Sequence, residues 1–404
     1  MSTPPTGPSH SRAAWFRQAV CETPRPASPR PQEQGCSSPR PLRLGLPVWL
    51  ALALSLGLAA EAHATPPRAP TLTVVGDVNF AGYPLAIAPF DKVRSLLASD
   101  LRIANAEGLL TDLPVAAYRE ARLDITAPAA AARHFQAFDL VGLANNHTWD
   151  GGAAGLRSQL ATFASLKLTT FGAAPTREAA YAPARYRWDG AAFIPTPGPT
   201  PSPGTPCLAV LGATLKSNRK PPKSNDSPHA ALATTDETRS DVLALVRAEH
   251  ERGCFVLVSL HGGKEGASHP DAKTRAFGLA LLDAGADLVA AHHPHVLQGL
   301  ELRKTTANGA PRLQAIAWSL GNFVFRNRTP EKRQTAVLHA TLRQNDSRLE
   351  LDAVSLLPVH SDRELLPRPA TPREAAAIAR LVAERSARYG TEVTLTPDGR
   401  ITLR

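Results

Sequence analysis

The chain has 404 residues and a formal net charge of +10, and it is long enough to bury the core of one large domain or of two ordinary ones. The excess of basic residues favours anionic partners in general. These residues are spread along the chain and form no basic stripe with interleaved aromatic residues, so nucleic acid is not an expected partner. The four cysteines include no Cys-x-x-Cys pair, which argues against a zinc-thiolate site.

The first 64 residues differ in kind from the rest. Residues 1–40 are rich in proline, serine and arginine without hydrophobic periodicity, so they are predicted to be disordered, and a start codon placed too far upstream would account for them. Residues 41–64 have the basic start, apolar centre and small-residue exit of a signal peptide. An uncleaved N-terminal membrane anchor is the alternative, because the apolar run 44–60 is nearly long enough to span a bilayer.

Cleavage of this leader would leave a chain that starts near Thr65. It would remove six arginines and three acidic residues, so that the formal charge becomes +7, and Cys207 and Cys254 would be the remaining cysteines. In an oxidising compartment these two cysteines are able to pair, but the sequence does not show whether they meet.

Strand-like and helix-like segments alternate through the rest of the chain. This alternation predicts an α/β layered fold whose sheet is buried on both faces. In chain order we expect a strand at 71–77, a helix at 91–99, a short strand to 106, a strand at 138–145, a helix at 151–166, a strand at 168–173, a helix at 240–253, a strand at 254–263, a helix at 271–286, and strands at 287–296 and 313–325.

Two segments interrupt the alternation. Residues 195–206, PTPGPTPSPGTP, are predicted to be a stiff surface loop, because proline fits neither a helix interior nor a central strand. Residues 216–236 are polar and basic at their start, which predicts a loop near one rim of the fold. We favour an inert insertion there over a lid that contacts substrate.

The last segment, 361–404, is predicted to be structural. The sequence TPRE that starts at Thr371 is a capping box with proline at the first helical position, and the helix should end before Gly390. The remaining residues predict a hairpin that turns at Asp398 and Gly399.

Five predicted strands are each followed by side chains that bind metals in other proteins. Since ligands in layered α/β folds bind at the carboxyl ends of the strands, these side chains should meet at one rim. They are Asp77 and Asn79 after the first strand, Asn105 and Glu107 after the second, Asn145, Asn146 and His147 after the third, His261 after the fourth, and His293 and His295 after the fifth.

This mixed oxygen and nitrogen set suits divalent ions such as Mn, Fe or Zn. It is too large for one ion, whereas two ions about 3.5–4 Å apart, bridged by a carboxylate, would use it and would clamp both oxygens of a phosphoester displacement. Pro294 is expected to fix the backbone at the strand end so that His293 and His295 both turn toward the metals. Taken singly, each signal has a structural explanation, as hydrogen-bonded loop histidines or as turn asparagines. Their joint order favours a metal site.

The ordered motifs resemble a known family. GDVNFAG, NAE, LANNHTWDGGAAGL, VSLHGGKE, LLDAGADLVAAHHPHVLQGLEL and WSLGNFVF, found between residues 71 and 325, resemble the CapA family of poly-gamma-glutamate capsule synthesis proteins, in the metallophosphatase-like (calcineurin-like phosphoesterase) superfamily. The resemblance implies that residues 65–360 form a metallophosphatase-like four-layer sandwich of two mixed β-sheets flanked by helices, with the site at one edge.

The resemblance also implies roles for individual residues. The expected metal ligands are Asp77, Glu107 as the bridging carboxylate, Asn146, His261, His293 and His295. His147 is implied to contact a substrate oxygen and to protonate the leaving group. Further ligands or residues that support ligands are expected at Asn79, Asn105, Glu265 and His292.

The sequence departs from the family pattern at two places that concern the site. The superfamily usually has histidine where this chain has Asn79, which leaves open whether one ion is weakly held or absent. Family members often have an aromatic residue where this chain has Gly262, so the sequence does not predict how the wall beside the substrate is formed here. Glu265 matches a family position. The alternative to a direct role at the metals is a structural one, in which Glu265 orients the ring of His261.

Two classes of function remain open. The first is an exported, metal-dependent hydrolase of a phosphoester or of a polyglutamate-type polymer, placed in the periplasm or elsewhere outside the cytoplasm of a bacterial cell. The second is a non-catalytic accessory protein that binds or guides an anionic polymer during export, working with capsule-synthesis membrane proteins. A cyclic-nucleotide phosphodiesterase is a third, less favoured reading, since export counts against it.

Overall fold

The structure is a computed structural model, and it describes residues 68–114, 125–196, 204–220, 224–225, 227–307, 310–327 and 329–404. The segments 1–40 and 41–64, and most of the proline-rich loop 195–206, lie outside the described residues. Within the described ranges, no helix is both long enough and apolar enough to cross a bilayer.

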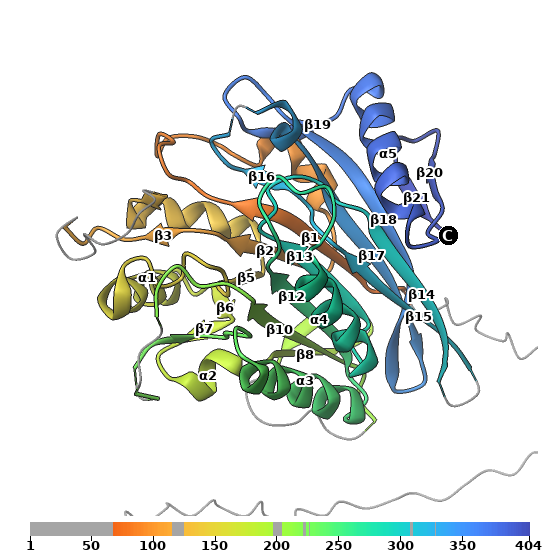
Figure 1. The fold of residues 1–404 in the computed structure, drawn as a ribbon, viewed down its shortest axis with the longest axis horizontal. Helices are drawn as coiled ribbons and strands as arrows, with labels where there is room; N and C mark the ends of the chain where they lie inside the picture. Colours follow the sequence, from red (N-terminus) through yellow and green to blue (C-terminus); the bar gives the residue numbers. More distant parts are fainter. Residues whose placement is uncertain are drawn as a thin grey trace, which may run out of the picture. The chain divides into compact units, whose positions relative to one another are not determined.

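The larger sheet has ten strands (Figure 1). Its main path runs β20-β21-β18-β17-β1-β2-β5-β6, while β16 pairs with β1 and β19 pairs with β18. The strands are β1 (Thr71–Val78), β2 (Leu101–Ala106), β5 (Leu140–Gly142), β6 (Thr169–Phe171), β16 (Asn322–Val324), β17 (Gln334–Asn345), β18 (Arg348–Ser361), β19 (Pro367–Pro369), β20 (Val393–Leu395) and β21 (Ile401–Leu403). The strands β1, β2, β5 and β6 are parallel, so their carboxyl ends share one edge.

The second sheet has seven strands in the order β14-β15-β13-β12-β10-β8-β9. Its parallel centre is made by β10, β12, β13 and β15, and antiparallel strands flank it on both sides. The strands are β8 (Ala184–Trp188), β9 (Phe193–Pro195), β10 (Cys207–Thr214), β12 (Phe255–His261), β13 (Leu288–His292), β14 (Leu300–Ala307) and β15 (Ala310–Ala317).

Side chains alternate along the central strands and build three apolar cores. Leu72 and Val74 of β1 share the core between the two sheets with Leu208 and Val210 of β10. The opposite face of the larger sheet packs on η1 (Asp91–Leu97), η3 (Ala129–Ala137) and α1 (Gly152–Ser165), and the opposite face of the second sheet packs on α3 (Asp236–Glu251) and α4 (Ala272–Asp283). Helix, sheet, sheet and helix layers therefore follow one another, and the predicted four-layer sandwich is confirmed (Figure 1).

Smaller elements complete the described chain. Two-stranded pairs are formed by β3 (Leu109–Leu110) with β4 (Thr126–Ala127) and by β7 (Ala173–Ala174) with β11 (His229–Ala230). The short helices are α2 (Arg177–Tyr181) and η4 (Pro330–Arg333). Because β11 lies in the predicted loop 216–236, that segment is tied to the body of the fold by a strand pair.

The C-terminal unit extends the larger sheet. Helix α5 (Pro372–Ala387) begins with the predicted capping box, in which Thr371 and Glu374 exchange side-chain and backbone hydrogen bonds. The chain turns at Gly390 with φ +72°, and the hairpin β20–β21 then pairs with β18. The helix and the hairpin are thus present within the segment where they are predicted, and the hairpin lies at the edge of the larger sheet.

Several predicted elements differ from the structure in detail. The strand expected at 313–325 is two strands in different sheets, because the chain crosses from β15 in the second sheet to β16 in the larger one, with Gly321 at φ +73°. The strand expected to end at Asn145 ends at Gly142, and the helix expected at 91–99 is a 3₁₀ helix that ends at Leu97. The long hairpin β17–β18 had not been predicted.

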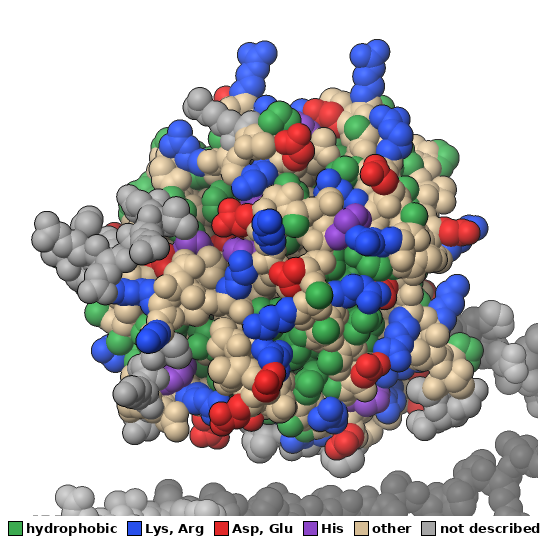
Figure 2. Space-filling model, viewed as in Figure 1, with side chains coloured by type: hydrophobic (Ala, Val, Ile, Leu, Met, Phe, Trp, Pro, Cys, Tyr) green, Lys and Arg blue, Asp and Glu red, His purple; other side chains and the backbone are tan. Residues whose placement is uncertain are grey.

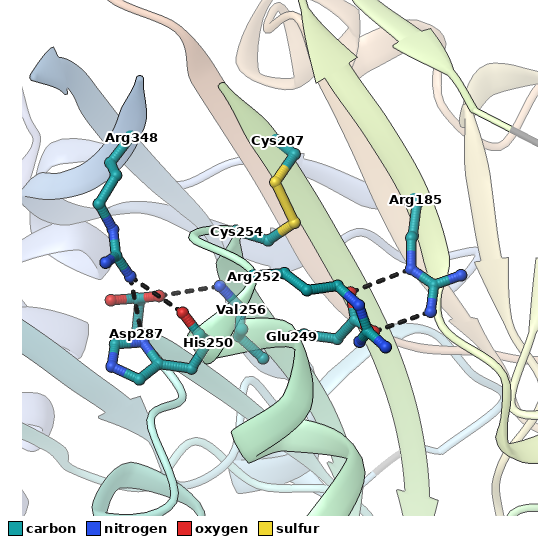
Figure 3. The surroundings of a disulfide bond; sticks show 9 residues. All are labelled: Arg185, Cys207, Glu249, His250, Arg252, Cys254, Val256, Asp287 and Arg348. Carbon is teal, nitrogen blue, oxygen red and sulfur yellow. Dashed lines mark hydrogen bonds and ion pairs between the residues drawn. A yellow bond between two sulfur atoms is a disulfide. The ribbon is translucent and has the colours of Figure 1, made fainter. Parts of the chain in front are cut away.

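The question of the cysteines is answered by the structure. Cys207 and Cys254 form a disulfide with a Cα–Cα distance of 4.6 Å, across the starts of the neighbouring parallel strands β10 and β12 (Figure 3). A buried acidic residue with two arginine partners lies near it. Glu249, whose side chain is fully buried, is bound by Arg185 at 2.7 Å and by Arg252 at 2.5 Å.

Candidate metal centre

The carboxyl ends of strands from both sheets meet at one rim, where the six side chains expected to bind metals lie together. β1 and β2 and the turn after β5 approach from the larger sheet, and β12 and β13 approach from the second sheet. All six side chains are buried: Asp77, Glu107, Asn146, His261, His293 and His295. The convergence that the sequence predicts is therefore present in the fold.

The ligand atoms form two groups that share Glu107. Those of Glu107, His261 and His293 lie within 4.8 Å of one another, and so do those of Asp77, Glu107 and His295. One carboxylate oxygen of Glu107 lies 3.6 Å from the Nε2 atoms of both His261 and His295. This is the position that a bridging carboxylate between two ions would take.

Polar atoms in these groups lack the partners that burial normally requires. Both carboxylate oxygens of Glu107 and both ring nitrogens of His293 are buried without a hydrogen-bond partner in the described part of the chain. Since buried polar atoms are costly unless they are bound, these atoms are available to bind a ligand. Divalent cations satisfy carboxylate and imidazole donors together, so the residues present fit such ions.

The electrostatics of the site also fit cation binding. Burial and the neighbouring Asp77 carboxylate raise the pKa of Glu107 well above its usual value. Burial, together with His293, lowers the pKa of His261 well below its usual value, and burial together with Lys216 lowers the pKa of His293 to about 3. Both imidazoles are therefore held in the neutral form that coordinates metals.

Asp77 is held in one orientation by its neighbours. Its carboxylate lies 3.1 Å from Nδ1 of His292 and 3.3 Å from Nδ1 of His295, and it accepts a 2.8 Å hydrogen bond from the Asn105 amide. Burial alone would raise the pKa of Asp77, but the contacts with the two histidines outweigh it and hold this pKa well below the usual value. His292 and Asn105 thus hold the Asp77 carboxylate in this orientation.

The backbone around Pro294 is folded into an unusual conformation. His293 has φ +97° and His295 has φ +57°, both in the region that non-glycine residues rarely adopt. Two backbone hydrogen bonds hold the segment, from Gly262 to His292 at 3.1 Å and from Gly266 to Pro294 at 2.9 Å. The backbone at the strand end is therefore fixed. The structure also shows that the residues on both sides of Pro294, His293 and His295, have strained backbone angles.

Two glycines explain why the first and last motifs lie together. A Cβ atom on Gly76 would lie 2.0 Å from the carbonyl oxygen of Gly321, and the Asp77 amide donates a 2.9 Å hydrogen bond to that same oxygen. Next to it, the Asn322 carboxamide oxygen lies 2.9 Å from Nδ1 of His295. Asn322 was missed as a site residue, although it is part of the WSLGNFVF motif.

The third rim motif supplies Asn146 and His147. The Asn146 carboxamide oxygen lies 2.7 Å from Nε2 of His261, beside the first ligand group. Nδ1 of His147 lies 2.5 Å from a carboxylate oxygen of Asp150, and both side chains are buried. Asp150 was also missed, although its place three residues after His147 on one turn is a sequence signal that could have found it.

The remaining predicted residues lie around the centre. Asn79 donates to the backbone oxygens of Glu107 at 2.6 Å and Ile125 at 3.0 Å and accepts from the Ala81 amide, so its carboxamide is engaged with backbone. Glu265 is exposed, with its carboxylate 3.8 Å from the Lys332 ammonium.

The orienting contact at Nδ1 of His261 comes from the second strand, because the Asn105 amide nitrogen lies 3.5 Å from that atom. The Asn145 carboxamide stabilises the turn that carries Asn146 and His147. It donates to the Ala106 carbonyl at 2.8 Å and accepts from the His147 amide, which braces the turn after β5.

The polar segment after β10 also reaches the site. Asn218 contacts Asn146, His147 and Asp150. The start of the segment 216–236, which the sequence predicts to be an inert insertion, therefore contacts residues of the site. Sequence reasoning missed Asn218 because nothing in a polar loop marks one asparagine among several.

Fold and rim together define a class, namely α/β sandwich proteins with a buried carboxylate and histidine centre that fits divalent ions. The family profile described as "Bacterial capsule synthesis protein PGA_cap" matches residues 71–327, and the chain belongs to this family. The resemblance to CapA proteins is thereby confirmed.

Two curated relatives and one solved structure show the extent of the similarity. The chain is 28% identical to the "PGA biosynthesis protein CapA" of Bacillus subtilis (strain 168) over 54% of this chain and 51% of that one, and 27% identical to the "Capsule biosynthesis protein CapA" of Bacillus anthracis over 54% and 47%. It thus spans about half the length of these relatives. The crystal structure of the calcineurin-like phosphoesterase YfkN from Bacillus subtilis matches with a TM-score of 0.41 and 13% identity, over 80% of this chain and 99% of that one.

Proposed function

We propose that the protein is an exported, metal-dependent hydrolase of the bacterial envelope that acts on a phosphoester or a polyglutamate-type polymer in capsule or poly-gamma-glutamate synthesis. The observation that carries this proposal is the pair of ligand groups that share Glu107, with a buried His147–Asp150 pair beside them. Export is supported by the leader-like segment 41–64 and by the disulfide, since disulfides persist in oxidising compartments.

The ligands divide between two ions. Glu107, His261 and His293, with the Asn146 carboxamide beside them, would hold one ion, and Asp77, Glu107 and His295 would hold the other. Divalent ions at such a centre supply Lewis-acid activation of water and neutralise the charge of a phosphoryl group. The mixed donor set suits Mn, Fe or Zn.

His147 and Asp150 supply the proton transfer. The carboxylate of Asp150, 2.5 Å from Nδ1 of His147, accepts the hydrogen of that nitrogen and fixes the tautomer and the ring plane. When the ring is an imidazolium, Nε2 carries the second proton; it donates this proton to the leaving-group oxygen and leaves a neutral ring with its hydrogen on Nδ1. Both side chains are buried, so the ring has little freedom to turn away from the reacting atoms.

The surroundings of the centre suit an anionic substrate. Lys216 is half-buried two residues beyond β10, and among the described residues it forms no ion pair with a carboxylate. Lys332, whose side chain is 18% exposed, approaches from η4. On the face drawn in Figure 2, lysine and arginine side chains are interspersed with acidic ones, and we base the expectation of an anionic substrate on the two lysines at the rim.

An accessory role is the second candidate, and the hydrogen bonds between the Asn79 side chain and the backbone favour it. The Asn79 carboxamide is bound to backbone at the place where the superfamily usually has a histidine ligand, so the Asp77 group has fewer side chains for its ion. A protein of this kind would bind or guide an anionic polymer during export, together with capsule-synthesis membrane proteins.

One experiment separates the two candidates. Full-length protein is purified, its bound metal is measured, and hydrolysis of a chromogenic phosphodiester and of polyglutamate is assayed with added Mn. We expect wild type to hold metal and to turn over, His147→Ala to hold metal without turning over, and His293→Ala to lose metal. Bound metal without turnover of either substrate by wild type would favour the accessory role.

A further inference from the structure

We propose that Asn218, in the polar segment after β10, is a positioning residue that fixes both a metal ligand and the His147–Asp150 pair. This inference rests on the proposed function and extends it to a residue outside the family motifs of the site. Its basis is a single carboxamide that is bound on both sides, by Asn146 and by Asp150.

The segment is attached to the site through its backbone. At the end of β10, the Leu215 amide donates a 2.8 Å hydrogen bond to the carbonyl of the ligand His261. Three residues later, the Asn218 amide donates a 3.1 Å hydrogen bond to the carbonyl of Asn146. The Arg219 guanidinium then donates to the carbonyl of Asp150 at 3.1 Å. The segment therefore lies along the turn that carries His147 and holds it at both ends.

The two contacts of the Asn218 side chain determine which way its carboxamide points. Its oxygen accepts a 3.2 Å hydrogen bond from the Asn146 amide nitrogen, and its amide nitrogen donates a 3.1 Å hydrogen bond to a carboxylate oxygen of Asp150. The flipped carboxamide would place two donors together on one side and two acceptors together on the other. One orientation alone satisfies both neighbours.

The contact with Asn146 determines which atom that ligand presents to the metal. Because the Asn146 amide nitrogen is bound to Asn218, its carboxamide oxygen points to the opposite side, where it lies 2.7 Å from Nε2 of His261. The oxygen is the atom that coordinates cations, whereas the amide nitrogen is not a ligand. Asn218 thus selects the coordinating orientation of Asn146.

The contact with Asp150 determines which oxygen faces His147. One carboxylate oxygen of Asp150 is occupied by the Asn218 amide, so the other is left for Nδ1 of His147, at 2.5 Å. The Asn218 amide nitrogen also lies 3.1 Å from that Nδ1, which packs the carboxamide against the ring. Loss of Asn218 frees the carboxylate and the ring together, while the ligands of the second ion are untouched.

The position is suited to mutation because Asn218 itself is exposed, so that removing its side chain leaves no buried cavity. Two variants separate its two contacts. Asn218→Ala removes both. Asn218→Asp keeps an oxygen that accepts from Asn146 and replaces the donor to Asp150 with a second carboxylate oxygen. Asn225→Ala, at another exposed asparagine of the same polar segment, is the matched control.

The experiment measures Mn affinity of the full-length protein by equilibrium dialysis, and kcat and KM for a chromogenic phosphodiester at saturating Mn. Removal of a partner that orients a metal ligand typically costs 10- to 100-fold in metal affinity or activity. We therefore expect Asn218→Ala to lose about 10-fold or more in Mn affinity and, separately, about 10-fold or more in kcat. Asn218→Asp should keep Mn affinity within about threefold of wild type and lose kcat, and Asn225→Ala should match wild type in both.

The outcomes distinguish this inference from the proposed function. A wild type that binds Mn, with Asn218→Ala of equal affinity and equal kcat, overturns the role of Asn218 and leaves the metal centre standing. If wild type binds Mn but hydrolyses no substrate, the affinity of Asn218→Ala still decides the contact with Asn146. A wild type that binds no Mn overturns the proposed function and the role of Asn218 with it.

Discussion

The Cys207–Cys254 disulfide yields a stability prediction whose size follows from its place in the chain. The bond joins residues 47 positions apart. In the chain-entropy account, a crosslink that closes a loop of this length lowers the entropy of the unfolded chain by an amount worth about 4 kcal/mol at 25 °C. Both cysteines are buried where β10 and β12 begin (Figure 3), and the backbone hydrogen bonds between these strands remain without the crosslink. Replacing both cysteines by alanine should therefore lower the free energy of unfolding by about 4 kcal/mol.

Urea denaturation of the full-length protein, followed by circular dichroism, measures this free energy. Each single variant, Cys207→Ala or Cys254→Ala, breaks the same crosslink as the double variant, so the three losses should be nearly equal and should not add. Ser259→Ala, at another buried position of β12, keeps the disulfide and should cost about 1 kcal/mol or less. A loss below about 1 kcal/mol in the double variant, or losses that add, would refute the reasoning.

Three further predictions follow from packing, protonation and metal binding. Gly76→Ala places a Cβ atom 2.0 Å from the Gly321 carbonyl oxygen; calorimetry should show a loss of about 1–3 kcal/mol or more, and an unchanged melting temperature would contradict it. Burial, with Arg312, lowers the pKa of His250 to about 4, so the unfolded state binds the extra proton between about pH 6.5 and 4 and stability falls as the pH decreases through that window. The full shift is worth about 3 kcal/mol, reduced to about 1–2 kcal/mol by solvent screening of this half-buried ring, and urea titrations of His250→Asn should show a flatter pH dependence. Mn at 100 times its Kd should stabilise wild type by about 2.7 kcal/mol in thermal denaturation and EDTA should reverse this, whereas an equal shift in His293→Ala would rule out the assigned ligand.

The parts of the fold that the sequence predicts are those with a local signal. β1, β12 and β13 are short apolar runs bounded by polar residues, and α5 has a capping box, so each can be recognised from a window of about ten residues. Sheet membership has no such signal. The sequence of residues 313–325 predicts a single strand, yet β15 and β16 belong to different sheets, because the partner of β16 is β1, more than 200 residues earlier in the chain.

The same distinction applies to the site. The convergence of its candidate ligands could be predicted because each lies at or just after the end of a recognisable strand, and parallel strands deliver their carboxyl ends to one edge. The residues that orient the ligands were missed, since their partners are set by the folded backbone. Asn322 meets His295 because the chain crosses between the sheets just before it, and Asn218 meets Asn146 because a loop is folded over the turn. Neither contact is marked by a periodic pattern of residues in the sequence.

The site is built at a cost to the stability of the fold. His293 and His295 hold positive φ angles, each worth about 1–3 kcal/mol of strain, and Glu107 keeps both carboxylate oxygens buried without hydrogen bonds in the described part of the chain. A protein whose rim served only to close the sandwich would gain stability from glycine at the two strained positions and from an apolar residue at Glu107. The surrounding packing instead holds these side chains in place, which is the arrangement expected where bound cations offset the cost. That argument applies equally to a hydrolase and to a polymer-binding protein, so turnover, and not metal content, decides between them.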